Sequence, residues 1–171
     1  MEAFICPICG DAYIGEAPPS NCPFCGAPRK YFTKPGDYKI SRLRGEISKI
    51  SRENITSAIK LEDSNSEFYL CASKSSANAG MRAIFRRLSK IEREHATVLR
   101  KLIGAGEESV IETCGENDGD NVRMAVTREE RAMASYSKFL SEAKEPGIRR
   151  VFEALVEIEK THVELLTGME R

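Results

Sequence analysis

Two short stretches decide how this chain folds: IEREH at residues 91–95 and IEKTH at residues 158–162. Each contains Glu-x-x-His within a strongly helical run, and His95 and His162 are the only histidines among the 171 residues. Residues three apart lie on the same face of a helix, so the glutamate and the histidine of each motif can hold one metal ion together. Two such motifs predict two metal ions held between paired helices.

The two motifs belong to a longer internal repeat. Residues 54–102 align without a gap on residues 121–169, at an offset of 67 that places His95 on His162. Besides the motifs, identical pairs at this offset include Asn54/Asn121, Glu62/Glu129, Tyr69/Tyr136 and Phe85/Phe152. One helical hairpin cannot bury its apolar stripe alone, but two hairpins can bury theirs against each other. The repeat therefore predicts a mainly α chain with a four-helix bundle over residues 51–171.

Composition excludes several classes of partner. The 26 Lys and Arg balance the 26 Asp and Glu, without a basic block, which argues against nucleic acid. No apolar run approaches the roughly 18–20 residues that cross a bilayer, so we expect no membrane partner. The first residues lack the basic flank and apolar core of a secretory signal. We therefore expect a cytoplasmic protein.

Residues 1–38 differ from the rest because they contain four of the six cysteines. The knuckles are CPICG at residues 6–10 and CPFCG at residues 22–26, with twelve residues between Cys9 and Cys22. Proline fixes each turn, and glycine permits a positive φ behind the sulfurs. The spacing predicts one metal ion in a tetrahedron of thiolates, which accepts iron or zinc. The ligands would be Cys6, Cys9, Cys22 and Cys25.

The remaining segments connect these units. We expect a linker with a short helix over residues 39–50 and a long glycine-rich connection over residues 104–119. Cys114 in that connection is interpreted as an incidental thiol, and Cys71 as a small core residue. The helices are expected from about Ser51 to a turn at 75–80, from Met81 to Ile103, from Asn121 to a turn at 145–147, and from Ile148 to Met169.

The four helices would each place one carboxylate in the bundle interior. Buried carboxylates repel one another and lose hydration, so four of them need compensating charge. Two metal ions supply it. A single glutamate on two helices and Glu-x-x-His on the other two is the ligand set of dimetal carboxylate bundles, and mixed oxygen and nitrogen ligands suit iron or manganese. The set is Glu62, Glu92, His95, Glu129, Glu159 and His162.

On these motifs the chain resembles ferritin-like proteins and, with its cysteine module at the N-terminus, rubrerythrins of the reverse arrangement. Phe4 and Tyr13 also lie where rubredoxins place aromatic residues around the metal. The resemblance implies one iron in the cysteine site and two in the carboxylate site. It implies that Glu62 and Glu129 are terminal ligands, that Glu92 and Glu159 bridge, that His95 and His162 each cap one metal, and that Tyr69 and Tyr136 hydrogen-bond ligand carboxylates.

The chain departs from this family at one position. Many rubrerythrins are similar but carry a second glutamate one turn along the third helix, where this chain has Ala132 and Met133. Glu67 lies about 140° round its helix from Glu62, and Glu130 about 100° from Glu129. The sequence leaves open whether Glu67 or Glu130 acts as an extra ligand.

The resemblance implies a non-haem iron oxidoreductase, a peroxidase. Electrons would pass from an NAD(P)H-linked reductase or a rubredoxin to the cysteine iron, and then to a diiron centre that reduces hydrogen peroxide to water. It also implies a homodimer in which each cysteine module serves the partner's diiron site. The alternatives are a ferroxidase or iron-handling ferritin-like protein, and a zinc ribbon joined to a bundle whose metals are structural.

Overall fold

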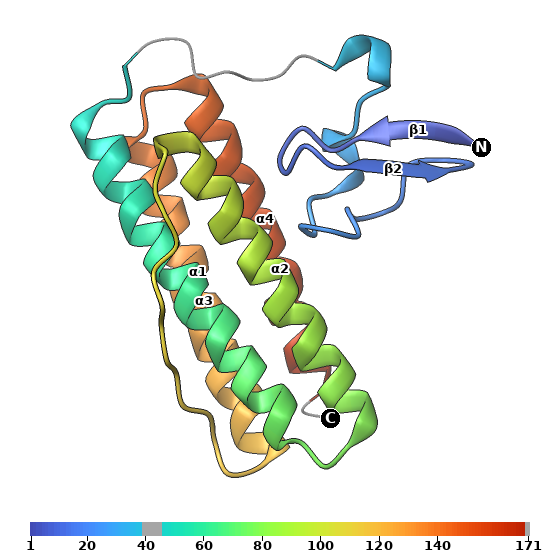
Figure 1. The fold of residues 1–171 in the computed structure, drawn as a ribbon, viewed down its shortest axis with the longest axis vertical. Coiled ribbons are helices and arrows are strands. Elements are labelled where there is room, and N and C mark those ends of the chain that lie inside the picture. Colours follow the sequence, from blue (N-terminus) through green and yellow to red (C-terminus); the bar gives the residue numbers. More distant parts are fainter. Residues whose placement is uncertain (39–45, 170–171) are drawn as a thin grey trace.

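The computed structural model describes residues 1–38 and 46–169. The predicted short helix of the linker falls largely on residues 39–45, which lie outside the described residues. The chain forms a small N-terminal β-hairpin module and a bundle of four long helices (Figure 1). No helix of the described residues is both long and apolar enough to cross a membrane.

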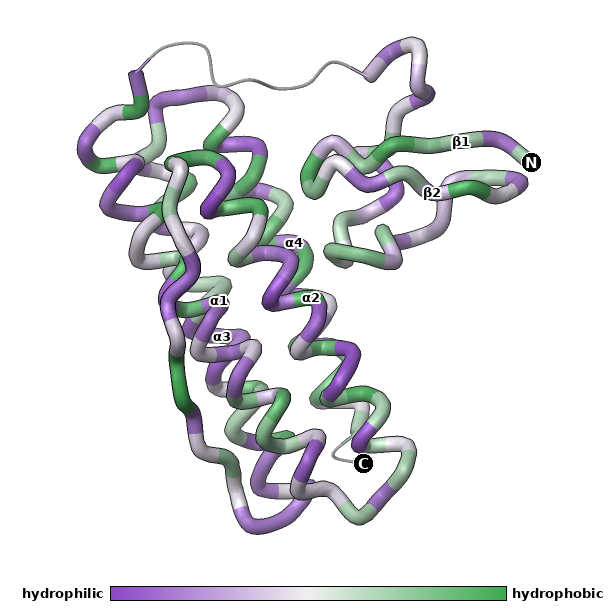
Figure 2. Tube along the Cα trace, viewed as in Figure 1, coloured by the Kyte–Doolittle hydropathy of each residue, from purple (hydrophilic) through white to green (hydrophobic). Residues whose placement is uncertain are grey.

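The helices pair as the repeat predicts. The first hairpin consists of α1 (Lys49–Ser75) and α2 (Ala79–Ile103), and the second of α3 (Asp118–Glu142) and α4 (Pro146–Met169). The hairpins meet with α1 against α3. Figure 2 shows hydrophobic and hydrophilic residues alternating along each helix, as expected for helices that bury one face in a shared core.

The start of α1 corrects our expectation by two residues. Ser48, and not Ser51, is the N-cap, and its side chain accepts a hydrogen bond from the Ser51 amide at 3.4 Å. The Ser51 hydroxyl instead donates to Glu145 Oε2 at 2.6 Å, and Glu145 Oε1 accepts from the Ser48 amide at 2.6 Å. A contact with the second hairpin therefore decides where the helix begins.

The other three predicted helix starts are late by two or three residues. Asn78 and Asn117 cap α2 and α3 through their side-chain oxygens, which accept amide hydrogen bonds from the first turn of each helix. Pro146 occupies the first position of α4, where its missing N–H costs no hydrogen bond. The turn between α1 and α2 is accordingly shorter than the sequence indicates, and the turn between α3 and α4 lies two residues earlier.

The N-terminal module is built on two strands that we did not predict. Strand β1 (Glu2–Ile5) pairs antiparallel with β2 (Ala12–Gly15). Behind each knuckle the chain turns at a glycine of positive φ, 89° at Gly10 and 79° at Gly26, as the sequence predicts. The amides of these two glycines donate to the carbonyls of Cys6 and Cys22 at 2.7 and 2.9 Å.

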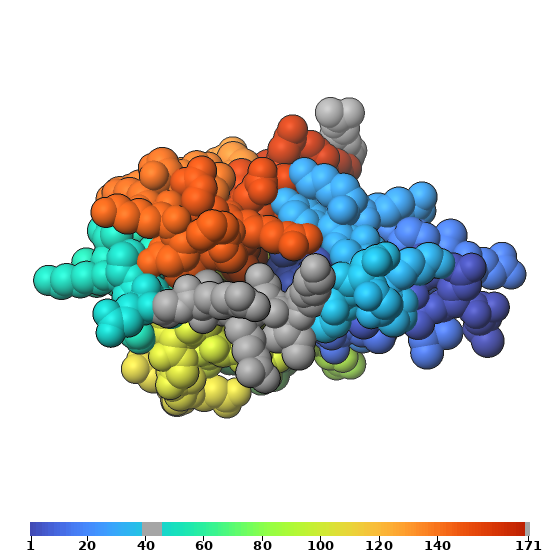
Figure 3. Space-filling model, turned by 90° about the horizontal axis from the view of Figure 1, so that it is seen from above, coloured from blue at the N-terminus to red at the C-terminus, as the bar shows by residue number. Residues whose placement is uncertain are grey.

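The module lies against α2 and α4 (Figure 1), and the view from above shows its blue atoms in contact with the orange-red atoms of α4 (Figure 3). One hydrophobic cluster runs through both parts, joining Ile8 and Tyr31 of the module to Val98, Val151 and Leu155 of the bundle. At the edge of this contact Lys30 and Tyr31 both donate to Glu157, at 2.6 and 3.1 Å. The module thus shares a core with the helices that carry the two Glu-x-x-His motifs.

The long connection between α2 and α3 runs along the outside of the bundle beside α1 and α3 (Figure 1). Its Glu112 accepts hydrogen bonds from Ser64 of α1 and from Arg128 of α3. A disulfide joins Cys114 of the connection to Cys71 of α1. Our interpretation of these two residues as an incidental thiol and a free core thiol is therefore wrong: they meet in space although 43 residues separate them.

Candidate metal centres

The four cysteines of the module meet behind the two knuckles. One sulfur from each of Cys6, Cys9, Cys22 and Cys25 lies within 4.8 Å of the others. The Sγ atoms of Cys6 and Cys25, and those of Cys9 and Cys22, are 3.8 Å apart. A tetrahedron with metal–sulfur bonds of about 2.3 Å has edges of about 3.8 Å, so the sulfurs fit one tetrahedral ion.

The pKa values of these thiols move in opposite directions. Hydrogen bonds from Cys25, Cys6 and Cys9 lower the pKa of Cys22, whereas the hydrogen bond with Cys22 raises the pKa of Cys9. Four sulfurs in this space cannot all be thiolates without a cation among them. A metal ion resolves that conflict and supplies much of the folding free energy of a module with so small a core.

The second donor set lies at the centre of the bundle and consists of two halves. Glu62, Glu92, His95 and Glu159 form one group and Glu92, Glu129, Glu159 and His162 the other, each with ligand atoms within 4.8 Å of one another. The four carboxylates are fully buried, and the two histidines are 1% and 5% exposed. The two imidazole rings stack with centroids 6.2 Å apart. The structure therefore brings together all six predicted ligands.

Two carboxylates belong to both halves. Glu92 offers Oε2 to His95 Nδ1 at 3.3 Å and Oε1 to His162 Nδ1 at 3.2 Å. Glu159 offers Oε1 to His95 Nδ1 at 3.5 Å and Oε2 to His162 Nδ1 at 2.9 Å. Glu62 faces only His95, with 3.4 Å between its Oε1 and Nδ1 of the histidine. Glu129 faces only His162, with 3.5 Å between the corresponding atoms. This is the arrangement expected if Glu92 and Glu159 bridge two ions.

The buried polar atoms of the cluster support this interpretation. Among the described residues, eight ligand-type atoms of the cluster are buried without a hydrogen-bond partner. They are Glu62 Oε2, Glu129 Oε2, both oxygens of Glu92, both oxygens of Glu159 and the Nδ1 atoms of His95 and His162. Such atoms are costly to bury unless something binds them. The set of oxygen and nitrogen donors fits iron or manganese.

The pKa shifts within the cluster also indicate that a cation is needed there. Burial raises the pKa of Glu62 to about 8, and burial next to Glu92 and Glu129 raises that of Glu159. Burial opposes the charge on His95 and His162, but the surrounding carboxylates outweigh it and raise both pKa values. Protons therefore occupy the cluster where no cation does, and a metal ion would displace them.

The two tyrosines bind carboxylates across the bundle. Tyr136 of α3 donates to Glu62 Oε1 of α1 at 2.6 Å, and Tyr69 of α1 donates to Glu129 Oε1 of α3. Burial, next to these carboxylates, raises the pKa of both phenols well above the usual value, so both remain donors. Each tyrosine leaves the second oxygen of its glutamate without a hydrogen-bond partner among the described residues.

A hydrogen bond connects the two donor sets. The Nε2 atom of His95 lies 2.8 Å from the backbone carbonyl oxygen of Cys25. A carbonyl only accepts, so Nε2 carries the proton and Nδ1 keeps its lone pair toward the carboxylates. The sequence showed no signal for this contact, because it joins residues 70 positions apart through the docking of one unit on another.

The remaining candidate carboxylates lie outside the cluster. Glu67 pairs with Arg93 at 2.9 Å and its side chain is 31% exposed. Glu130 is exposed, and Ala132, about one turn on from Glu129, is buried. Among the described residues, neither Glu67 nor Glu130 joins a metal-binding group.

Comparison with protein families accounts for both units. The family model of rubrerythrin matches residues 53–170, and the model of the rubrerythrin rubredoxin-like domain matches residues 4–33. Reverse rubrerythrin-1 from Clostridium acetobutylicum is 28% identical over 115 residues, 61% of this chain and 63% of that protein. The chain thus aligns with somewhat less than two thirds of that relative's length. The predicted order, with the cysteine module leading, is confirmed.

Two solved structures are similar. A hypothetical protein from Pyrococcus furiosus has a TM-score of 0.59 and 25% identity, covering 70% of this chain and 87% of that chain. The manganese catalase KatB from Anabaena has a TM-score of 0.61 and 14% identity, covering 78% of this chain and 77% of that chain. The second likeness concerns the fold alone. The fold is a ferritin-like four-helix bundle preceded by a rubredoxin-like module, and the chain belongs to the rubrerythrin family.

Proposed function

We propose that this protein is a non-haem iron oxidoreductase that reduces hydrogen peroxide to water, with electrons relayed through the four-cysteine site. The observation that carries the proposal is the 2.8 Å hydrogen bond between His95 Nε2 and the carbonyl of Cys25. It makes a short path from one donor set to the other, through the Cys25 backbone and the His95 ring. Zinc in the cysteine site could not pass electrons along such a path, because zinc has no redox chemistry.

When bound, one iron at the cysteines and two at the carboxylates would supply the electrons for the overall reaction H2O2 + 2 H⁺ + 2 e⁻ → 2 H2O. The protein's own part is to prepare the site. Glu62 and Glu129 would be terminal ligands held by Tyr136 and Tyr69, and Glu92 and Glu159 would bridge. The full burial of the four carboxylates excludes bulk water and strengthens their interactions.

The resemblance implied that each module serves a partner's bundle, whereas here the module contacts the bundle of its own chain. The proposal therefore routes electrons within one chain. Membership of the family supports a homodimer, as well as an NAD(P)H-linked reductase or a rubredoxin as the upstream donor. Gel filtration with light scattering tests the dimer, and reduction by purified candidate donors tests the supply of electrons.

The deciding experiment is anaerobic stopped-flow mixing of the iron-reconstituted, fully reduced protein with hydrogen peroxide, monitored at the visible band of the ferric cysteine site. We expect rapid recolouring in the wild type and in Glu94→Ala, a matched control on α2 that does not belong to the cluster. Glu92→Ala and His162→Ala should recolour at least about 100-fold more slowly, since loss of a ligand or its partner typically has effects of this size.

Other outcomes would reject the proposal. A protein that is colourless as isolated, with zinc at the cysteines by elemental analysis, would support the zinc-ribbon alternative. Recolouring at equal rates in the cluster variants would mean that peroxide oxidises the cysteine iron directly. Catalytic oxidation of added ferrous iron, without peroxide turnover, would support the ferroxidase alternative.

A further inference from the structure

Cys71 and Cys114 have no part in either metal centre. Both are half-buried, and they form the disulfide between α1 and the long connection. A cavity of about 460 Å³ at the surface is lined by seven residues of this neighbourhood: Glu67, Leu70, Cys71, Lys74, Ser75, Ile111 and Glu112. A solute as small as hydrogen peroxide can therefore reach the bond.

The surroundings of the pair suit thiol chemistry. The Oγ atom of Ser75 lies 3.6 Å from Cys114 Sγ, where a hydroxyl can donate to a thiolate. Lys74 lines the cavity beside Cys71 and carries a positive charge. A thiolate is the nucleophile in thiol oxidation, and nearby donors and cations favour it.

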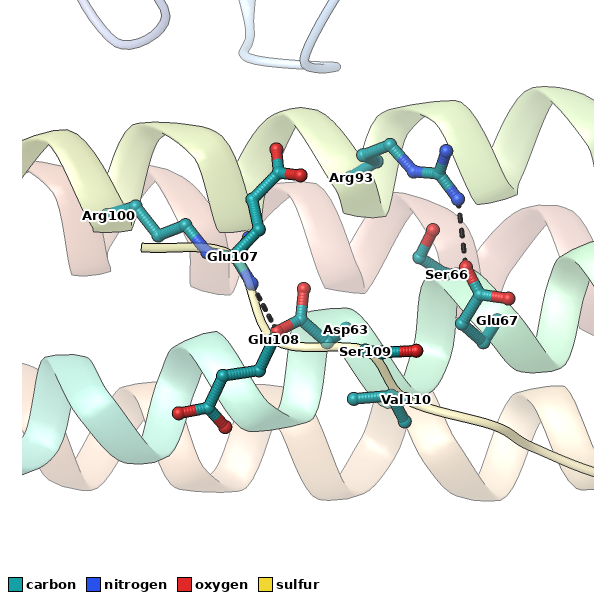
Figure 4. A pocket seen from close by; sticks show the side chains of 9 residues that line it. All are labelled: Asp63, Ser66, Glu67, Arg93, Arg100, Glu107, Glu108, Ser109 and Val110. Atoms are coloured by element: carbon teal, nitrogen blue, oxygen red, sulfur yellow. Dashed lines mark hydrogen bonds and ion pairs between the residues drawn. The ribbon is translucent and has the colours of Figure 1, made fainter. Parts of the chain in front are cut away.

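The bond also holds the connection at one end of its course over α1. Toward its other end, Arg100 donates to the Gly106 carbonyl at 3.0 Å. Between these points residues 107–110 form one wall of a second cavity of about 280 Å³ (Figure 4). The opposite wall includes Asp63 and Arg93, which follow Glu62 and Glu92 in the chain. On this wall two ion pairs, Arg100–Asp63 and Arg93–Glu67, join α2 to α1. The connection thus covers the surface just outside the carboxylate cluster.

We propose that Cys71 and Cys114 form a second redox site, a dithiol that hydroperoxides oxidise to the disulfide, and that this bond keeps the connection closed over the face beside the carboxylate cluster. In the first step one thiolate attacks a peroxide oxygen, the O–O bond breaks, and a sulfenic acid and water result. In the second step the other thiol attacks the sulfenic sulfur, the S–S bond forms and a second water leaves. The balance is 2 RSH + H2O2 → RSSR + 2 H2O, so the sulfurs are oxidised and the peroxide is reduced.

The test uses the full-length, metal-loaded protein. It is treated with dithiothreitol, freed of the reductant under anaerobic conditions, and mixed with hydrogen peroxide before alkylation and peptide mass mapping. We expect alkylated Cys71 and Cys114 after the reductant and the disulfide-linked peptide after peroxide. With dimedone present, Cys71→Ser or Cys114→Ser should trap a sulfenic acid on the remaining cysteine.

Three results would overturn this site. In the first, dithiothreitol does not reduce the disulfide in the folded protein. In the second, peroxide leaves the two thiols unchanged. In the third, neither single variant forms a dimedone adduct. The same measurement in His162→Ala separates this site from the peroxidase proposal, since pair oxidation should persist where the carboxylate cluster is disabled. Loss of pair oxidation there would show that the thiols are oxidised by way of that cluster and would overturn the direct step.

The second half of the proposal concerns the connection. Hydrogen–deuterium exchange over residues 105–117 should be faster in the reduced protein and in the double variant Cys71→Ser/Cys114→Ser than in the disulfide form. The turn at residues 143–145, between α3 and α4, is the internal control and should not change. Equal exchange of the connection in the two redox states would overturn the closing role.

Discussion

At the scale of single residues, each histidine of the cluster uses its two ring nitrogens differently. His95 gives Nε2–H to a carbonyl of the module and turns Nδ1 toward the carboxylates. Spacing along a helix predicts which side chains meet, because it depends on local geometry. It cannot predict the tautomer, because that depends on Cys25, which only the docking of the module brings to His95.

The tyrosines give the first prediction. In Tyr136→Phe, Glu62 Oε1 loses its donor inside a buried site. We expect the free energy of unfolding to fall by about 1–3 kcal/mol, the usual cost of leaving a buried polar group unpaired, in a denaturant titration. Tyr13→Phe is the control, because the Tyr13 hydroxyl makes no hydrogen bond within the described residues. An equal effect of both substitutions would contradict this role of Tyr136.

The second prediction concerns pH in the metal-free protein. Burial raises the pKa of Glu62 to about 8, and that of Glu159 also rises, whereas an unfolded chain titrates near 4.5. The folded state then keeps protons that the unfolded state releases, so stability falls as pH rises from about 4.5 to about 8. The raised pKa values of His95 and His162 add to the loss above about pH 6.5.

We therefore expect the metal-free helical bundle, followed by helical circular dichroism, to have a higher free energy of unfolding at about pH 5.5 than at about pH 8. The ionisation of Glu92 does not reverse this dependence of the free energy of unfolding on pH. Burial opposes its ionisation, but His162 and His95 lower its pKa, so its contribution is lost only below about pH 4.5. Ferrous iron should stabilise the protein more at the higher pH, because it replaces the protons. Metal-free stability that increases from about pH 5.5 to about pH 8 would contradict the prediction.

At the scale of elements, the duplicated hairpin made most of the bundle predictable. Phe85 and Phe152 match in the repeat and both are fully buried, as are Tyr69 and Tyr136. The strands of the module were missed because four-residue strands carry too little periodicity to detect. The Cys71–Cys114 bond was missed for another reason: the pairing depends on how the connection crosses α1, and spacing along the chain does not record it.

A third prediction tests how the module contacts α4. Gly26 has a φ of 79°, and a Cβ atom there would lie 3.1 Å from Ile158 Cγ2. We expect Gly26→Ala to lower the stability of the module by about 1–2 kcal/mol from the backbone conformation alone, measured as loss of the metal–thiolate band in denaturant. Gly36→Ala should have little effect, because its Cβ meets no atom within 4 Å. Similar losses in both variants would reject the tight contact at Gly26.

At the scale of the whole molecule, the two units depend on metal to different degrees. The bundle has a hydrophobic cluster of its own, which includes Phe68, Phe85 and Leu166 and no residue of the module. The module has few buried side chains besides its cysteines. We therefore predict that Cys6→Ser releases the cysteine-bound metal and unfolds the module, while the helical circular dichroism remains.

Cys71→Ser is the matched control for this variant, because it removes a cysteine without touching the module and should keep the visible band. Limited proteolysis should cut the Cys6→Ser protein within residues 1–38 and leave the bundle intact. Loss of the helical signal together with the band would show that the bundle depends on the module for its fold.

Duplication gave the bundle two equivalent histidines, and the docked module removes that equivalence. Gly26 lies beside His162, yet no hydrogen bond from His162 Nε2 occurs within the described residues, whereas His95 Nε2 is bound to Cys25. A twofold arrangement of ligands thereby becomes asymmetric, because one imidazole is hydrogen-bonded to the backbone of the thiolate site and the other is not. A spectroscopic probe of the two imidazoles should find them distinct, with Nε2–H hydrogen-bonded in His95 and not in His162.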